Sequence, residues 1–235
     1  MKKLWSLLTS LRVAIWLTGI VLAFLAYGAF VLPKEEIFTA MNAEPLFSWL
    51  LRAPLVYSWW LWGTIFVLGL LTVNTVFCSL DSFIKKKSAF LLILAPQVIH
   101  IGFLFILLAH LLSSIGSYKL TGGVPEGVSV GLPNGQGFKL VKIEATPGPQ
   151  GYIADWEARI EHIAGGQVMK RDVLRPNKPS FYGGLGFYLK DLRFEPYPMA
   201  LIEVSREPGA LWALIGGILF TAGTVALIIL KMRQE

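Results

Sequence analysis

The stretch that decides the fold is APQVIHIGFLFILLAHLLSSIG, which runs from Ala95 to Gly116. It has the length and the apolar character of a helix that crosses a bilayer core of about 30 Å. It nevertheless contains two imidazoles, His100 and His110. Ionisable groups at that depth are costly and usually have a partner or a function. The segment therefore predicts a membrane helix, and its two histidines are the first candidates for a site.

The rest of the chain contains three more apolar segments of spanning length. The composition is 54% hydrophobic and 15% charged, and the mean hydropathy is +0.60. Such values are unusual for a soluble domain. We predict transmembrane helices at about 13–32, 54–80 and 92–115, within an N-terminal region 1–115. A fourth helix and a short cytoplasmic tail are predicted within 208–235.

Basic residues gather in three short segments: the N-terminus, the loop after the second predicted helix, and the C-terminus. Together these segments hold eight basic and two acidic residues, which equals the net charge of +6. Short positively charged loops stay in the cytoplasm. The pattern predicts a multi-pass integral protein of the inner (cytoplasmic) membrane with both termini in the cytoplasm. The basic excess is then a topology signal and does not indicate binding to nucleic acid.

Residues 116–207 have a different pattern, which predicts a small extracytoplasmic antiparallel β domain between the third and fourth helices. The sequence YIADWEARIEHI alternates between apolar and polar residues, as a half-buried strand does. Gly165-Gly166 then predicts a hairpin turn into QVMKRDVLR. FKLVKIEAT, FYLKDLRFE and ALIEVSR are further strand candidates. The predicted fold class is therefore membrane α-helical with four transmembrane helices plus this β domain.

His100 and His110 cannot share one metal ion. At 1.5 Å and 100° per residue, they lie about 15 Å apart along the helix and about 80° apart around it. Each therefore needs its own partner. Either another helix of this chain hydrogen-bonds the imidazole, or a second polypeptide completes an axial pair on a haem iron, for which neutral imidazole is a suitable ligand.

Other polar or small residues have simpler interpretations. Asn74 is expected to hydrogen-bond between helices, and His162 is expected to be packed at the end of an apolar strand face. The small residues of the last helix predict a close packing surface; they are Gly216, Gly217, Ala222 and Gly223. The chain has no nucleotide-binding motif, no nucleophile–base pair and no Cys-x-x-Cys-His motif for covalent haem.

Four short motifs resemble the ResB/CcsB membrane proteins of system II cytochrome c biogenesis, of which the chain looks like a short variant. They occur in the family's order along nearly the whole chain. The motif residues are Asn74, Cys78, Ser79 and Leu80; His100 and Gly102; Gly116, Glu126 and Gly127; and Asn177, Pro179, Gly186 and Tyr188.

The resemblance implies a haem-handling subunit for cytochrome c maturation that works with a CcsA/ResC-like membrane protein and serves apocytochrome c. It implies an accessory part of a haem transport or cytochrome c synthase complex, which is not a catalyst by itself. His100 would be one axial ligand of a non-covalent haem b whose other ligand comes from the partner. His110 occupies a place where a small residue is expected, so the resemblance assigns it no role.

A second hypothesis is a b-type haem-binding membrane subunit of an electron-transfer complex of the quinol or cytochrome class. His100 and His110 would then each bind a haem together with ligands from a neighbour. A third is an assembly scaffold without haem. The identity of the partner distinguishes the first two hypotheses.

Overall fold

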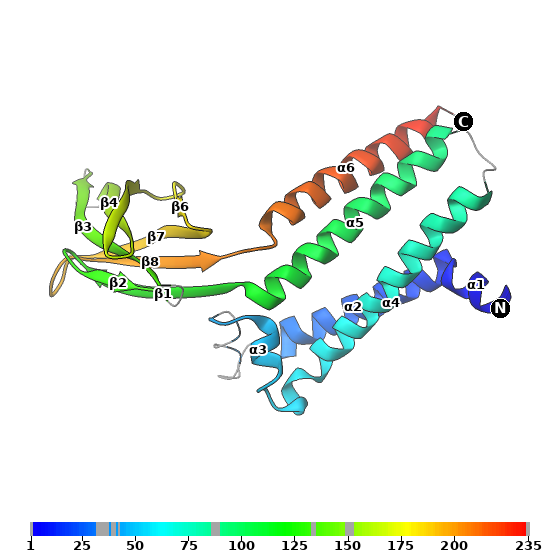
Figure 1. Cartoon of the computed structure of the whole chain (residues 1–235), viewed down its shortest axis with the longest axis horizontal. Coiled ribbons are helices and arrows are strands. Elements are labelled where there is room, and N and C mark those ends of the chain that lie inside the picture. The colour runs from blue at the N-terminus through cyan, green and yellow to red at the C-terminus, as the bar shows by residue number, and fades with distance from the viewer. Residues whose placement is uncertain are drawn as a thin grey trace. The chain divides into compact units, whose positions relative to one another are not determined.

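The computed structural model describes residues 2–31, 38, 41, 43–85, 90–132, 135–148 and 153–233. They belong to two compact units, Met1–Gly116 with Pro208–Glu235, and Ser117–Glu207. The helices, labelled in Figure 1, are α1 (Lys2–Leu8), α2 (Leu11–Val31), α3 (Leu46–Leu50), α4 (Leu55–Lys85), α5 (Phe90–Gly116) and α6 (Ala210–Met232). The strands are β1 (Tyr118–Pro125), β2 (Ser129–Gly131), β3 (Gln136–Pro147), β4 (Ile153–Ala164), β5 (Gln167–Leu174), β6 (Ser180–Tyr182), β7 (Leu185–Arg193) and β8 (Met199–Arg206).

Within the described residues, four helices are long and apolar enough to cross a membrane. The spanning segments are Leu11–Phe30, Leu55–Ile84, Leu94–Gly116 and Ala210–Met232. The prediction of four such helices is confirmed, and the chain is an integral membrane protein. The second helix is longer than predicted, since α4 continues to Lys85 rather than ending at residue 80.

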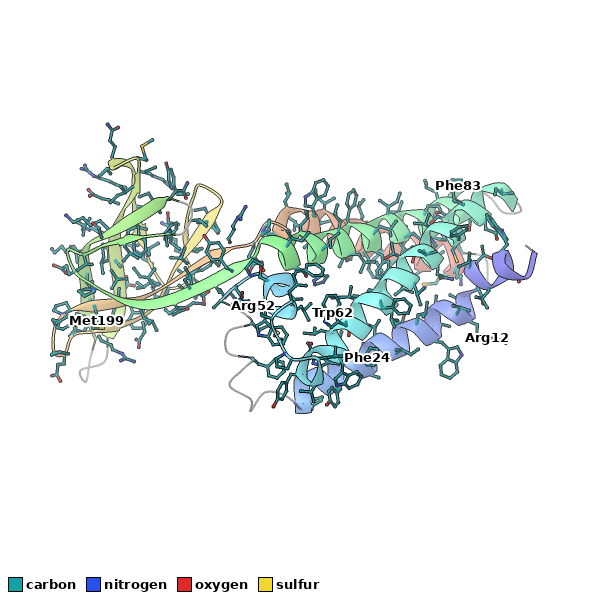
Figure 2. All side chains as sticks on the ribbon, turned by 60° about the horizontal axis from the view of Figure 1, so that its bottom comes forward. Arg12, Phe24, Arg52, Trp62, Phe83 and Met199 are labelled. Atoms are coloured by element: carbon teal, nitrogen blue, oxygen red, sulfur yellow. The ribbon has the colours of Figure 1, made fainter. Side chains whose placement is uncertain are left out.

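Helices α2 and α4 pack through aromatic rings, each of which lies against a glycine of the facing helix. The ring of Trp60 on α4 covers Gly28 on α2, and the ring of Phe24 on α2 lies against Gly63 on α4, where an added Cβ would be 2.8 Å from the Phe24 ring. Figure 2 shows Phe24 on α2 beside α4. A side chain at either glycine would require the facing ring to move, so the two glycines allow α2 and α4 to pack closely.

Helices α5 and α6 approach more closely, along small residues that recur every seven positions. These residues are Ala95, Gly102 and Ala109 on α5, and Gly209, Gly216 and Gly223 at the start of and along α6. An added Cβ at Gly102 would be 2.5 Å from the backbone nitrogen of Phe220. A seven-residue repeat of small side chains lets two membrane helices pack backbone to backbone.

The packing surface predicted in the last helix is confirmed for two of its glycines and wrong for a third. An added Cβ would clash with α5 at Gly216 and at Gly223, whereas Gly217 has nothing within 4 Å. Gly217 is one residue further round the helix and so points away from α5.

The short helix α1 is held against the end of α4 by polar contacts. The side-chain amide of Asn74 donates to the carbonyl of Leu8 at 2.8 Å, and the indole N–H of Trp5 donates to Asp81 at 3.0 Å. The Asn74 bond satisfies a carbonyl at the end of a helix, which has no partner inside the helix. The predicted role of Asn74 in bonding between helices is confirmed.

The second unit consists of two four-stranded antiparallel sheets. Their strand orders are β1-β8-β7-β6 and β2-β3-β4-β5. The core is apolar and takes residues from both sheets; for example, Phe138 of β3 meets Phe187 of β7 edge to face, with ring centroids 5.4 Å apart. Each sheet thus buries one face against the other, as in a β-sandwich.

Strand β4 follows the predicted alternation. Ala158, Ile160 and His162 are buried, while Asp155 and Arg159 are exposed. The predicted hairpin is also confirmed: Gly165 and Gly166 have φ angles of 59° and 76° between β4 and β5. Both angles are positive, as a two-residue hairpin turn requires.

Three strands were not predicted. β2 and β6 have only three residues each, too few for a periodic pattern to appear. β1 contains Gly122 and Gly123, which favour a turn in an isolated sequence. In the structure all eight residues of β1 pair with β8, in the register Tyr118 opposite Arg206. Pairing with a distant strand therefore overrides the local preference.

Candidate functional site

His100 lies on α5, half-buried, and one of its ring nitrogens is held by α4. Its Nδ1 atom is 2.8 Å from the hydroxyl oxygen of Ser79. The other nitrogen, Nε2, makes no hydrogen bond with the residues that the structure describes. Helix α4 therefore fixes the orientation of the imidazole and leaves one nitrogen of the ring available.

Two further polar groups lie near this contact on the same pair of helices. The Ser79 hydroxyl also reaches the carbonyl of Thr75 one turn earlier, at 3.0 Å. Gln97 is 3% exposed and lies three residues before His100 on α5; its side-chain nitrogen has no partner in the described part of the chain. Buried polar groups without partners are rare. This end of the α4–α5 contact is therefore unusually polar for two membrane helices.

His110 lies in different surroundings. It is exposed and forms part of the wall of an open groove of about 340 Å³ between α4 and α5. No charged residue lines the groove; the lining residues are Ile65, Leu68, Gly69, Thr72, Leu104, Leu107, Leu108, His110, Leu111 and Ser114. His100 is not among them, so the structure does not bring the two candidate histidines into one site. This agrees with their separation of about 15 Å along one helix.

The third histidine, His162 on β4, is completely buried in the sandwich and belongs to a polar chain. Its Nε2 is 2.9 Å from the hydroxyl of Ser180, which donates to Asp172 at 2.6 Å. Asp172 also accepts from the ammonium of Lys170 at 2.8 Å. The ring stacks on Tyr182, and its Nδ1 is buried without a partner among the described residues.

The surroundings of these two groups favour a neutral imidazole at His162 and an ionised carboxyl at Asp172. Burial and then the charge of Lys170 lower the pKa of His162 below its usual 6.5, although Asp172 acts in the opposite direction. Burial alone would raise the pKa of Asp172, but bonds from Lys170, Ser180 and the Val173 N–H lower it to about 2. The prediction that His162 is a packed residue is confirmed. Ser180 and Asp172 had no sequence signal, because their pairing depends on how two strands meet.

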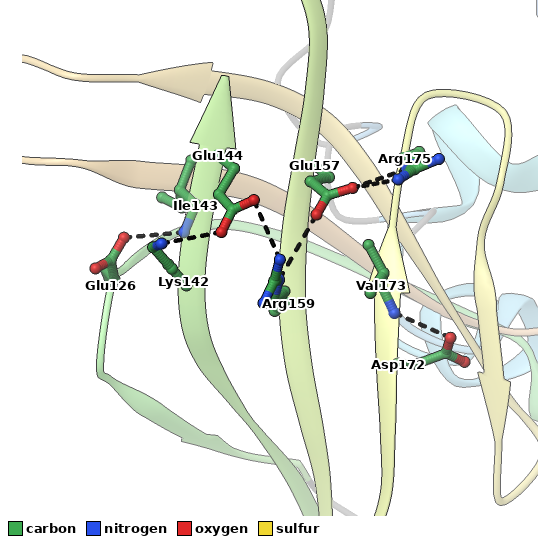
Figure 3. Close-up of polar contacts among 9 residues, drawn as sticks. All are labelled: Glu126, Lys142, Ile143, Glu144, Glu157, Arg159, Asp172, Val173 and Arg175. Atoms are coloured by element: carbon green, nitrogen blue, oxygen red, sulfur yellow. Dashed lines mark hydrogen bonds and ion pairs between the residues drawn. The ribbon is translucent and has the colours of Figure 1, made fainter. Parts of the chain in front are cut away.

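Charged residues on the outer face of β3, β4 and β5 form a row of ion pairs, which Figure 3 shows. Arg159 lies 3.2 Å from Glu144, and Glu157 accepts two bonds from Arg175. The hydrogen bond from Lys142 is the main cause that lowers the pKa of Glu144. In the described residues no group of three or more potential metal ligands is found. The carboxylates of Glu144 and Glu157 are therefore each paired with cationic side chains.

The donor chemistry at His100 suits an axial ligand of a haem. Imidazole is a common haem ligand, and a ligating histidine almost always donates its other ring N–H to a nearby acceptor. The Ser79 hydroxyl can accept a bond of that kind, because its oxygen lies 2.8 Å from Nδ1. No second imidazole of the chain shares the site, because His110 lines a separate groove and His162 is buried in the β unit.

Comparisons with known proteins identify no family. No protein-family model matches the chain, and no curated protein matches it. Among solved structures, the chain is similar to one described as cytochrome c haem lyase CcmF, with a TM-score of 0.46 and 14% sequence identity. The similarity covers 88% of this chain and 33% of that one, so the chain spans about a third of the length of CcmF. At this score the similarity identifies neither the fold nor the function.

Proposed function

We propose that the chain is a haem-handling subunit for cytochrome c maturation and contributes one axial ligand, His100, to a haem b within the membrane. The observation that carries the proposal is the His100 contact. An imidazole on a membrane helix has Nδ1 held by Ser79, and its Nε2 makes no hydrogen bond in the described part of the chain. Histidines inside membranes are rare and mark functional sites.

The second axial ligand would come from another polypeptide. His110 and His162 lie in other surroundings, so this chain offers His100 no second imidazole. The resemblance of four motifs to ResB/CcsB proteins supports a CcsA/ResC-like membrane protein as that partner. When bound, the haem would supply an iron porphyrin that can be reduced and passed on; the chain's own part is to hold and orient one ligand.

The charge pattern supports an orientation for the complex. With both termini and the loop after α4 in the cytoplasm, the β unit would be extracytoplasmic, on the side where apocytochromes c receive haem. Arginines pair with Glu144 and Glu157 on the surface of the unit, and the unit has no cysteine. We propose that it shapes the exit side of the complex or receives the apocytochrome, as an accessory part and not as the catalyst.

A second candidate function is a b-type subunit of an electron-transfer complex. The observation that favours it is the groove of about 340 Å³ with His110 in its wall. A second haem held there with a neighbour's ligand would lie about 15 Å along the helix from the first.

Difference spectra of the purified complex test both functions. The chain is purified together with its partner from membranes, and reduced-minus-oxidised spectra are recorded for the wild type, His100→Ala and His110→Ala. Loss of the b-type absorbance only in His100→Ala is the expected result. Loss of separate fractions in the two variants would favour the electron-transfer function. A wild-type complex without haem would contradict both.

A further inference from the structure

The hydroxyl of Ser79 has two partners that compete for its single hydrogen. The carbonyl of Thr75 lies 3.0 Å away and can only accept, while His100 Nδ1 lies 2.8 Å away and can donate or accept. A serine hydroxyl has one hydrogen to donate and two lone pairs that accept. Both contacts are satisfied together when Ser79 donates to Thr75 and His100 donates to Ser79.

We infer that Ser79 is a positioning residue that sets the tautomer of His100. The ring hydrogen is on Nδ1, and Nε2 carries the free lone pair that a metal requires. This inference rests on the proposed function only for the use of Nε2 by haem iron. The tautomer itself is a property of the chain and can be measured without haem.

The same reasoning gives the opposite tautomer at His162. The Ser180 hydroxyl donates to Asp172 at 2.6 Å, so the Nε2 of His162 must carry the ring hydrogen and donate to Ser180. Its free lone pair is then on Nδ1, which is buried without a partner among the described residues. A single chain thus contains both tautomers. Each is set by a serine that donates its hydroxyl hydrogen to another acceptor, Thr75 or Asp172.

The bond to Ser79 also changes the ligand strength of His100. A hydrogen bond from Nδ1–H makes the lone pair of Nε2 a stronger electron-pair donor to a metal, and it fixes the plane of the ring. Loss of such a second partner typically weakens metal binding about 10- to 100-fold. We therefore expect Ser79→Ala to bind haem more weakly and to shift its midpoint potential upward, because a weaker donor stabilises the oxidised iron less.

The tautomers are tested first in the full chain without haem, with ¹⁵N-labelled histidine in detergent. The chain has three histidines, so His100→Gln and His162→Gln assign the ring signals. Protonated and unprotonated ring nitrogens have well-separated ¹⁵N shifts. The expected result is Nδ1–H at His100 and Nε2–H at His162. An Nε2–H tautomer at His100 in the wild type would overturn the inference.

Serine variants then test the cause. Ser79→Ala should change the tautomer of His100 and leave that of His162 unchanged. Ser79→Thr should have the wild-type tautomer at His100, because threonine keeps the hydroxyl. Ser82→Ala is the matched control, since Ser82 donates to the carbonyl of Cys78 at 2.9 Å in the same manner, one turn later. An unchanged His100 tautomer in Ser79→Ala would overturn the role of Ser79.

Haem titration of the complex completes the test. Expected results are a 10- to 100-fold weaker retention of haem in Ser79→Ala, a midpoint potential above that of the wild type, and wild-type behaviour in Ser79→Thr and Ser82→Ala. Wild-type haem retention and potential in Ser79→Ala would overturn the positioning role. If the tautomers are as inferred but the wild-type complex contains no haem, the proposed function fails, and the use of Nε2 as an iron ligand fails with it.

Discussion

His100 and His162 each lie against a serine hydroxyl, at 2.8 and 2.9 Å, yet they differ in the ring nitrogen that makes the contact and in their burial. His100 is half-buried on a membrane helix, is held through Nδ1 and keeps Nε2 free of hydrogen bonds to the described residues. His162 is completely buried in a β-sandwich, is held through Nε2 and has an enclosed Nδ1. The comparison teaches that two features act separately. What the neighbouring serine does with its own hydrogen decides which ring nitrogen keeps a free lone pair, and burial decides whether a ligand can reach that nitrogen.

Replacing each histidine by alanine should separate the two roles most strongly. His162→Ala removes a buried ring that stacks on Tyr182 and meets Phe187. Loss of an aromatic-sized core side chain costs about 3 kcal/mol or more. His100→Ala removes one hydrogen bond between membrane helices, worth about 0.6 kcal/mol. Hydrogen exchange of β4–β6 and of α5, measured in the full chain, gives both values. Equal losses in the two units would contradict the comparison.

A substitution at Gly102 should disturb the helices that hold His100 and leave the surroundings of His162 intact. An added Cβ there would be 2.5 Å from the Phe220 backbone nitrogen, which cannot rotate away. Overpacking of this kind costs about 1–3 kcal/mol. We expect Gly102→Val to speed exchange in α5 and α6 while β4 stays protected.

The control for this substitution is Gly217→Ala, because Gly217 has nothing within 4 Å. It should behave as the wild type. If the two variants lose equal protection in α5, then the close approach of α5 and α6 does not stabilise the helical unit.

Acidification should destabilise the strands of the β unit that surround His162. Because its pKa is lowered from 6.5 in the folded chain, the unfolded chain binds the proton first. The stabilisation is complete above about pH 6.5 and is lost as the pH falls through the lowered pKa, by at most about 1.4 kcal/mol per pH unit. The stabilisation contributed by ionised Asp172, whose pKa is about 2 in the folded chain instead of 3.8, is lost only below pH 3.8.

The measurement is the pH dependence of exchange in β4, corrected for the intrinsic rate of exchange. His162→Gln keeps an N–H donor for Ser180 but cannot titrate, so it should flatten the dependence from pH 6.5 down to pH 3.8, where Asp172 begins to contribute. A slope that persists in this variant would assign the acid sensitivity to other groups.

The smallest effect is expected one residue away, on the other face of the same strand. Glu161 accepts from Arg171 at 2.8 Å, and the Arg171 side chain is 80% exposed. Exposed ion pairs contribute less than about 1 kcal/mol and are weakened by salt. Arg171→Gln should therefore change exchange in β4 by less than His162→Ala does, and the difference should shrink at high ionic strength. A larger effect than that of His162→Ala would show that burial does not decide which of the two substitutions destabilises β4 more.

Much of the fold could be predicted because it depends on local patterns. The four spanning helices follow from runs of apolar residues, and β4 with its hairpin follows from alternation and from Gly165-Gly166. The seven-residue repeat of small residues, from Ala95 to Ala109 and from Gly209 to Gly223, was also present in the sequence. Of its six residues, only Gly216 and Gly223 belong to the predicted packing surface, because the matching residues of α5 lie on a helix distant in the chain.

The surroundings of the candidate site could not be predicted in the same way. His100 was recognisable from its place in an apolar segment, but its partner Ser79 is 21 residues away, on a helix whose facing side the sequence does not define. The groove beside His110 likewise depends on how α4 and α5 diverge. Ser180 reaches His162 only because a three-residue strand, too short to predict, lies at that place in the sandwich.

The close approach of α5 and α6 has a consequence for biosynthesis. The residues Ser117–Glu207 separate the two helices in the chain, so at about 5–20 residues per second a ribosome needs roughly 5–20 s to extend from one helix to the other. During that interval the small-residue face of α5, formed by Ala95, Gly102 and Ala109, lacks α6, which covers it in the finished chain. A chain whose synthesis stops within the β unit therefore has α5 without the helix that packs against it in the finished protein.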